Sequence, residues 1–162
     1  MGVCGTSRDD STTDALAERV GHLIASRGGI VVCGGLGGVM AAAARGAARA
    51  GGFSIGLLPG DRAEDAAADV SLAIPTGMGE MRNALIVRAC PVIIAIGGAY
   101  GTISEIGLAL RNRRPVIGLD TWEIRPPRGR GPDPGIRRAS SPDEAVTMAF
   151  AAVDRAAASA RR

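Results

Sequence analysis

Residues 97–105 carry a dense group of chemistry-bearing positions. Gly97, Gly98 and Gly101 follow an apolar run, and Thr102 and Glu105 lie in the helix that is predicted to begin there. Backbone N–H groups, a hydroxyl and a carboxylate one helical turn further on are the groups that a phosphate and a ribose require. The spacing Thr102-x-x-Glu105 is also that of a capping box, in which Glu105 would only satisfy backbone N–H groups.

A second glycine-rich segment, residues 34–38 with the sequence GGLGG, also leads from an apolar run into a predicted helix. The N–H groups and the positive dipole end of such a helix favour an anion. Met40 stands where the third glycine of a GxGxxG dinucleotide fingerprint would be, so that pattern is incomplete. The alternative is that these glycines serve only a tight turn and close helix packing. The candidate phosphate-binding residues here are Gly34, Gly35, Gly37 and Gly38.

Arg82 lies near the start of another predicted helix, after the segment 75–81. A cation is unfavourable at a helix N-terminus, where the dipole prefers acidic side chains. A local rule that is broken at the ligand-facing end of an element indicates function. The alternative is an arginine that is simply exposed to solvent.

The basic residues exclude two classes of enzyme. All 19 of them are arginine, and the chain contains no lysine. An internal Schiff base with pyridoxal phosphate and a Walker-A phosphate loop both need a lysine amine, so neither is possible. Cys4, Cys33 and Cys90 are odd in number and lack CxxC or Cys/His spacing, which predicts no metal site and no disulfide framework. No resident cofactor is expected.

The charge is modest, with a formal net value of +3 and a pI near 9.2. Part of the excess lies in residues 125–138 and 161–162, which we interpret as a solvated loop and tail, so no nucleic-acid partner is predicted. No charge-free apolar stretch of 18 residues occurs, and no secretory leader is evident at Met1, so we expect a cytoplasmic protein with no membrane partner.

Short β-branched runs alternate with longer alanine-rich segments, which indicates repeated βα units around a parallel sheet. With 162 residues, 46% of them hydrophobic, we expect one domain over residues 1–162 with a Rossmann-like, doubly wound α/β/α fold in three layers. A mobile loop is predicted at about residues 123–139. The predicted strands are 1–4, 29–33, 54–58, 70–73, 92–96 and 116–119. The predicted helices are 13–26, 39–50, 81–89, 102–111 and about 142–158, with at most a helical turn in 61–69.

The order of these motifs resembles the Lonely Guy (LOG) phosphoribohydrolase superfamily, whose members were long labelled lysine decarboxylases. The resemblance covers roughly residues 2–120 and rests on GGLGGVM, then Leu-Leu-Pro, then Met-Arg-Asn, then GGAYGTISE. The superfamily marker is PGGxGTxxE with an arginine on the preceding helix. The chain departs from it at Gly97, Ala99 and Asn83, where the superfamily has Pro, Gly and Lys. This pattern is similar to a bacterial side branch that also resembles molybdenum-cofactor carrier proteins.

The resemblance implies a homodimer or homotetramer that binds a small phosphorylated ligand, either a nucleoside monophosphate or a pterin-like molecule. It implies two functional alternatives. One is hydrolysis of the N-glycosidic bond of a purine nucleoside 5′-monophosphate, with Glu105 and Arg82 as catalytic residues. The other is a non-catalytic binder or carrier of a phosphorylated ligand such as molybdenum cofactor or a nucleotide. In both, the second turn would bind phosphate through Gly98, Ala99, Tyr100, Gly101 and Thr102.

A NAD-dependent oxidoreductase is a third hypothesis, with Asp61 as the acceptor for a ribose hydroxyl. It lacks the third glycine of the fingerprint and any evident pair of residues to handle a hydride. A decarboxylase that depends on a lysine-bound cofactor is excluded, because the chain has no lysine.

Overall fold

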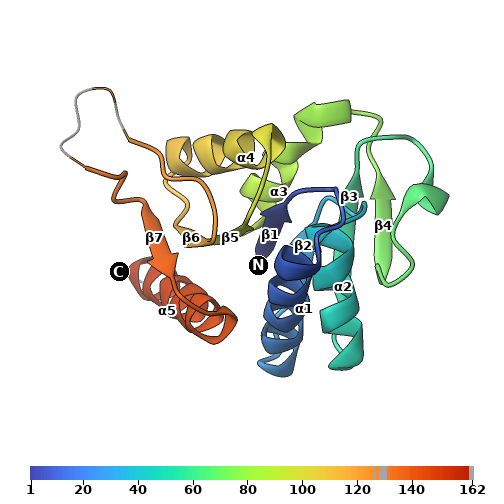
Figure 1. Ribbon diagram of the computed structural model, residues 1–162, viewed down its shortest axis with the longest axis horizontal. Coiled ribbons are helices and arrows are strands. Elements are labelled where there is room, and N and C mark those ends of the chain that lie inside the picture. The colour runs from blue at the N-terminus through green and yellow to red at the C-terminus, as the bar shows by residue number, and fades with distance from the viewer. Residues whose placement is uncertain (126, 128–130, 161–162) are drawn as a thin grey trace.

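The computed structural model describes residues 1–125, 127 and 131–160, and it contains one seven-stranded parallel sheet in the order β4-β3-β2-β1-β5-β6-β7 (Figure 1). The strand at the centre is β1, whose Gly5 pairs with Ile96 of β5. The strands are β1 (Gly2–Gly5), β2 (Val31–Cys33), β3 (Ser54–Leu58), β4 (Leu72–Pro75), β5 (Ile93–Ile96), β6 (Val116–Leu119) and β7 (Ile136–Ala139).

Helices cover both faces of the sheet, as Figure 1 shows. One face packs against α1 (Ser11–Ser26), α2 (Val39–Arg49) and α5 (Pro142–Ala160). The other face packs against α3 (Asn83–Ala89) and α4 (Tyr100–Arg111). The predicted Rossmann-like, doubly wound fold in three layers is therefore confirmed. Two short 3₁₀ turns complete the elements, η1 (Ala63–Asp65) and η2 (Gly79–Arg82).

The central strands are apolar along their whole length because helices cover both of their faces. Every side chain of β5 is fully buried, and β6 is buried throughout as well. Such continuous runs of Val, Ile and Leu are typical of parallel strands inside a three-layer fold. Strand β5, whose carboxyl end leads into α4, is therefore packed on both faces. Among the described residues, no helix combines the length and the hydropathy that a membrane crossing requires.

The structure corrects the predicted mobile loop at residues 123–139, because its last four residues form β7. This strand pairs in parallel with β6, with Ile117 opposite Arg137. The sequence Ile-Arg-Arg-Ala has one buried apolar residue, Ile136, and it follows Pro134 and Gly135, so it lacks the apolar pattern of the inner strands. An edge strand needs less burial than a central one, which is why this element was missed. Residues 126 and 128–130 of the predicted loop lie outside the described residues.

The edge strand β4 begins two residues later than predicted, at Leu72 and not at Val70. Two serines hold its start, since each donates its backbone N–H to the hydroxyl of the other: Ser54 N to Ser71 Oγ at 3.0 Å, and Ser71 N to Ser54 Oγ at 3.1 Å. The backbone N–H of Val70 instead closes a turn onto Ala67. Side-chain hydrogen bonds have thus replaced ladder pairing at the residues where the strand was expected.

Candidate functional site

A cavity of about 460 Å³ lies at the carboxyl ends of β1 and β5. The connection after β1 leads to α1 on one face of the sheet, and the connection after β5 leads to α4 on the other. Neighbouring strands whose connections diverge in this way create the crevice where open α/β sheets bind ligands. The wall is formed by Gly5, Thr6, Ser7, Arg8, Leu36, Met40, Pro59, Glu80, Arg82, Asn83, Ala99, Tyr100, Gly101, Thr102 and Glu105.

The N-terminus of α4 opens into this cavity without a cap of its own. The N-cap residue is Ala99, in extended conformation, and in the described part of the chain it makes no side-chain capping hydrogen bond. Thr102 is 1% exposed, and its buried hydroxyl has no hydrogen-bond partner among the described residues. The capping-box interpretation of Thr102 and Glu105 is therefore wrong. Unpaired N–H groups and a buried hydroxyl at a helix N-terminus form a site suited to an anion.

Arg82 and Glu105 form a buried ion pair behind this turn. Their Nη1 and Oε1 atoms are 3.8 Å apart, and the two residues are 7% and 6% exposed. Burial raises the pKa of Glu105 to about 7; Arg82 opposes this rise, Glu80 adds to it, and a hydrogen bond from the Cys4 thiol opposes it weakly. Glu105 is thus a carboxyl group that changes its charge near neutral pH, inside a cavity open to a ligand.

A chain of hydrogen bonds positions Arg82. Its Nη1 donates to Asn83 Oδ1 at 2.6 Å, and Asn83 Nδ2 donates to Ser104 Oγ at 3.3 Å. The Ser104 hydroxyl in turn donates to the carbonyl of Gly101 at 2.7 Å. Asn83, where the LOG superfamily has lysine, therefore joins the start of α3 to the first turn of α4. A Cβ atom on Gly34 would collide with the Arg82 guanidinium, so that glycine leaves room for it.

The first glycine-rich turn donates hydrogen bonds to another loop of the protein, the one between β1 and α1. The backbone N–H of Val39 donates to Thr6 O at 3.1 Å, and that of Gly38 donates to Asp9 Oδ1 at 3.3 Å. The N-terminus of α2 is thus used to hold the loop between β1 and α1. Gly34, Gly35, Gly37 and Gly38 do not line the cavity.

Residues 1–146 match the SLOG cluster4 family. The chain belongs to this family. An uncharacterized protein of Archaeoglobus fulgidus is 42% identical over 147 residues, which cover 90% of this chain and 91% of that protein. The structure is similar to the molybdenum cofactor binding protein from the phototrophic bacterium Rippkaea orientalis, with a TM-score of 0.83 and 32% identity over 94% of this chain and 95% of that one.

The molybdenum cofactor carrier protein MCP from Chlamydomonas reinhardtii has a TM-score of 0.81 and 28% identity over 94% of this chain and 96% of its own. The resemblance to the LOG superfamily and to carrier proteins is therefore confirmed.

In this SLOG family member the predicted site residues fall into two sets. Those that the fold brings together on one cavity are Glu105, Arg82, Ala99, Tyr100, Gly101 and Thr102. Those that do not line it are Gly98, Asp61 and the four glycines of the first turn. A Cβ atom on Gly98 would abut the Thr102 side chain, so this glycine sits behind the threonine.

Sequence analysis missed the loop of Thr6, Ser7 and Arg8, which forms one wall of the cavity in this SLOG protein. The signal was available, because the loop follows the carboxyl end of a strand, the position at which parallel sheets bind ligands. The first predicted strand, residues 1–4, ends just before this loop, but no residue of the loop was among the candidates. Tyr100, 83% exposed at the mouth, stacks on Trp122 with ring centroids 6.3 Å apart.

Proposed function

We propose that the protein binds a small phosphorylated ligand in the cavity between β1 and α4, with the phosphate at the N-terminus of α4. The observation that carries this proposal is the buried Thr102 hydroxyl, which has no hydrogen-bond partner in the described part of the chain and lies in the first turn of a helix without a side-chain cap. A buried polar group without a partner is costly, and a bound phosphate would satisfy it together with the first N–H groups of the helix.

The rest of the cavity suits the remainder of such a ligand. Its volume of about 460 Å³ lies within the range of small-molecule sites. Arg8 and Arg82 both line the cavity and supply positive charge. Leu36, Met40 and Pro59 supply apolar surface, and Tyr100 offers an aromatic face at the mouth. The combination of an anion site, cations and apolar walls matches a phosphate joined to a ring system.

We favour a carrier role, with a phosphorylated pterin such as molybdenum cofactor as cargo. The similar structures are described as molybdenum cofactor binding and carrier proteins, and the likeness to each covers more than nine-tenths of both chains. Asn83 supports this choice, because its two hydrogen bonds position Arg82 without the lysine of the hydrolase pattern. Binding tolerates such a difference more readily than catalysis does.

A second candidate function is hydrolysis of a nucleoside 5′-monophosphate to the free base and ribose 5-phosphate. One observation favours it: Glu105 is a buried carboxyl group whose pKa is raised to about 7. In its ionised form it would accept hydrogen bonds from the ribose hydroxyls and stabilise positive charge on the sugar as the glycosidic bond breaks. Water would add to the anomeric carbon, and the base would leave with a proton.

One experiment separates the two functions. The purified protein is titrated calorimetrically with molybdenum cofactor and with AMP, and each mixture is then analysed chromatographically for free base and ribose 5-phosphate. Binding of the pterin without release of base from AMP supports the carrier. Release of adenine that is lost in Glu105→Gln supports the hydrolase. Absence of binding to both ligands contradicts the site itself.

The homodimer or homotetramer that the resemblance implies stays a prediction. Apolar side chains are exposed along β4 and around η2, at Leu72, Ile74, Met78 and Met81. A contact between subunits would cover such a surface. Sedimentation velocity of the purified protein measures the number of subunits directly.

A further inference from the structure

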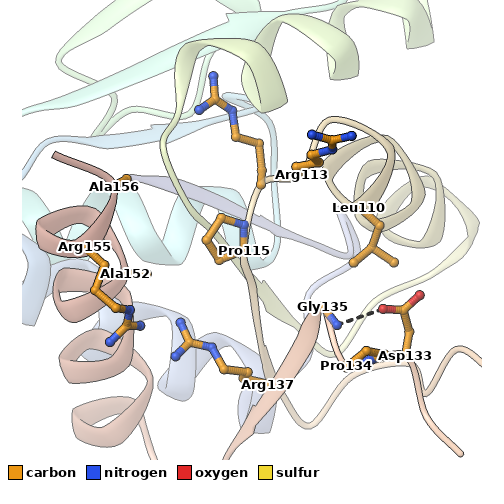
Figure 2. A pocket seen from close by; sticks show the side chains of 11 residues that line it. Leu110, Arg113, Pro115, Asp133, Pro134, Gly135, Arg137, Ala152, Arg155 and Ala156 are labelled. Carbon is orange, nitrogen blue, oxygen red and sulfur yellow. Dashed lines mark hydrogen bonds between the residues drawn. The ribbon is translucent and has the colours of Figure 1, made fainter. Parts of the chain in front are cut away.

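A second cavity, of about 580 Å³, lies at the opposite ends of the strands from the first (Figure 2). Its wall includes Pro115 and Gly135, which directly precede β6 and β7, so it opens at the amino ends of these strands. The last turns of α5 close another side through Ala152 and Ala156. The cavity at α4, in contrast, lies at the carboxyl ends of the strands. The two cavities have no lining residue in common.

Arginine dominates this second cavity. Four arginines and one aspartate line it, namely Arg113, Arg114, Arg137, Arg155 and Asp133. One carboxylate oxygen of the aspartate accepts a hydrogen bond from Gly135 N at 2.8 Å, within the same loop (Figure 2). Within the described part of the chain, no ion pair to a carboxylate involves the first three of these arginines.

The arrangement of these cations needs more explanation than helix dipoles provide. Arg113 and Arg114 follow the C-terminus of α4, where the dipole favours positive charge. Arg137, in contrast, is a residue of β7, and Figure 2 shows its guanidinium and that of Arg155 on α5 pointing toward one another. The wall carries a single aspartate against these arginines, and its excess of positive charge favours an anionic ligand.

The other walls are apolar, formed by Leu110, Pro115, Pro134, Ala152 and Ala156. A ligand for this cavity therefore combines strong negative charge with a compact non-polar part. Guanidinium groups bind phosphates through paired, planar N–H donors, and three of them can bind more than one phosphate group. We propose that this cavity binds a small organic oligophosphate, of the class of nucleoside di- and triphosphates. The proposal is independent of the function assigned to the α4 cavity.

The test is calorimetric titration with ATP and with inorganic pyrophosphate. The double variant Arg113→Gln/Arg137→Gln is compared with wild type and with Arg88→Gln, which removes an exposed arginine of α3 outside both cavities. Thr102→Val is titrated in parallel to separate binding at the α4 cavity. Thermal unfolding without ligand verifies that each variant is folded.

We expect the double variant to bind ATP at least tenfold more weakly than wild type, while Arg88→Gln and Thr102→Val keep this binding. ATP should bind more tightly than pyrophosphate because the apolar walls contact its organic part. The proposal is overturned if wild type binds no ATP, if the folded double variant binds it as wild type does, or if Thr102→Val abolishes all binding. Equal affinity for pyrophosphate and ATP would contradict the claim that the apolar walls bind the organic part of the ligand.

Discussion

The two glycine-rich turns, residues 34–38 and 97–101, look alike in the sequence, yet they make different interactions in the fold. Each follows an inner strand and opens a helix. At the first turn, the N–H groups of Gly38 and Val39 are taken by the loop between β1 and α1. At the second turn, the helix has no cap and the Thr102 hydroxyl has no partner in the described chain. The first turn therefore binds another loop of the protein, whereas the second faces the cavity.

The difference teaches that glycine content alone does not locate an anion site. A helix N-terminus offers its N–H groups to a ligand only when no neighbouring loop has already used them. The first turn still serves the site indirectly, because it holds the wall of Thr6, Ser7 and Arg8 in place. Three experiments, with four substitutions between them, test these different roles of the two turns.

The largest effect is expected at Glu105, in the helix of the second turn. Its pKa of about 7 in the folded protein exceeds the ordinary value of 4.5. Protonation therefore favours the folded state, and this stabilisation is present below pH 4.5 and is lost as the pH rises through 7. Relative to Glu105→Gln, wild type should lose on the order of 3 kcal/mol of unfolding free energy over this window.

Urea unfolding from pH 4.5 to pH 8 measures this difference. Glu64→Gln, at an exposed carboxylate in η1, should follow the wild-type profile. Parallel profiles for wild type and Glu105→Gln would show that the buried carboxyl group does not titrate in this range.

A pair of alanine substitutions tests the two turns directly. Gly38 has a φ of 58°, and a Cβ atom there would lie 2.5 Å from Thr6 O, so Gly38→Ala should destabilise the fold by about 1–3 kcal/mol. Nothing lies within 4 Å of a Cβ atom at Gly101, so Gly101→Ala should leave stability unchanged or raise it by up to about 1 kcal/mol. It should weaken ligand binding about tenfold by crowding the cavity.

Chemical denaturation and calorimetry on both variants make this comparison. If Gly101→Ala unfolds the protein while Gly38→Ala leaves its stability intact, the roles assigned to the two turns are reversed.

The smallest of the three effects should follow Thr102→Val, which removes one hydroxyl and keeps the shape of the side chain. Stability without ligand should stay the same or rise by up to about 1–2 kcal/mol, because a buried unpartnered hydroxyl is lost. Affinity for AMP at the α4 cavity should fall about tenfold or more. Thr147→Val, an exposed position on α5, is the matched control and should bind as wild type does. A loss of stability in Thr102→Val with unchanged affinity would contradict the role of the hydroxyl.

Sequence patterns predicted the inner elements well, because burial on both faces imposes long apolar runs. The strands Ser54–Leu58 and Val116–Leu119 have the bounds that were predicted. The family resemblance named Arg82 and Glu105 together as site residues, and the two residues form an ion pair. Strand β7 was missed because an edge strand such as Ile-Arg-Arg-Ala buries only one apolar side chain.

Local sequence patterns could not show that the first glycine-rich turn binds another loop of the protein. It depends on Thr6 and Asp9, which lie about 30 residues earlier in the chain and reach the N-terminus of α2 only through the fold. The role of Asn83 was hidden for the same reason, since its partner Ser104 lies on a different helix. Both interactions join distant segments and leave no periodic trace in the sequence.

The central claim is that the second turn, and not the first, binds the phosphate. A crystal structure with a bound phosphorylated ligand such as AMP tests it most directly. The account predicts a phosphate oxygen within hydrogen-bond distance of Thr102 Oγ1 and of the first N–H groups of α4. A phosphate on the N–H groups of Gly34–Gly38, with the Thr102 hydroxyl still unpaired, would contradict it.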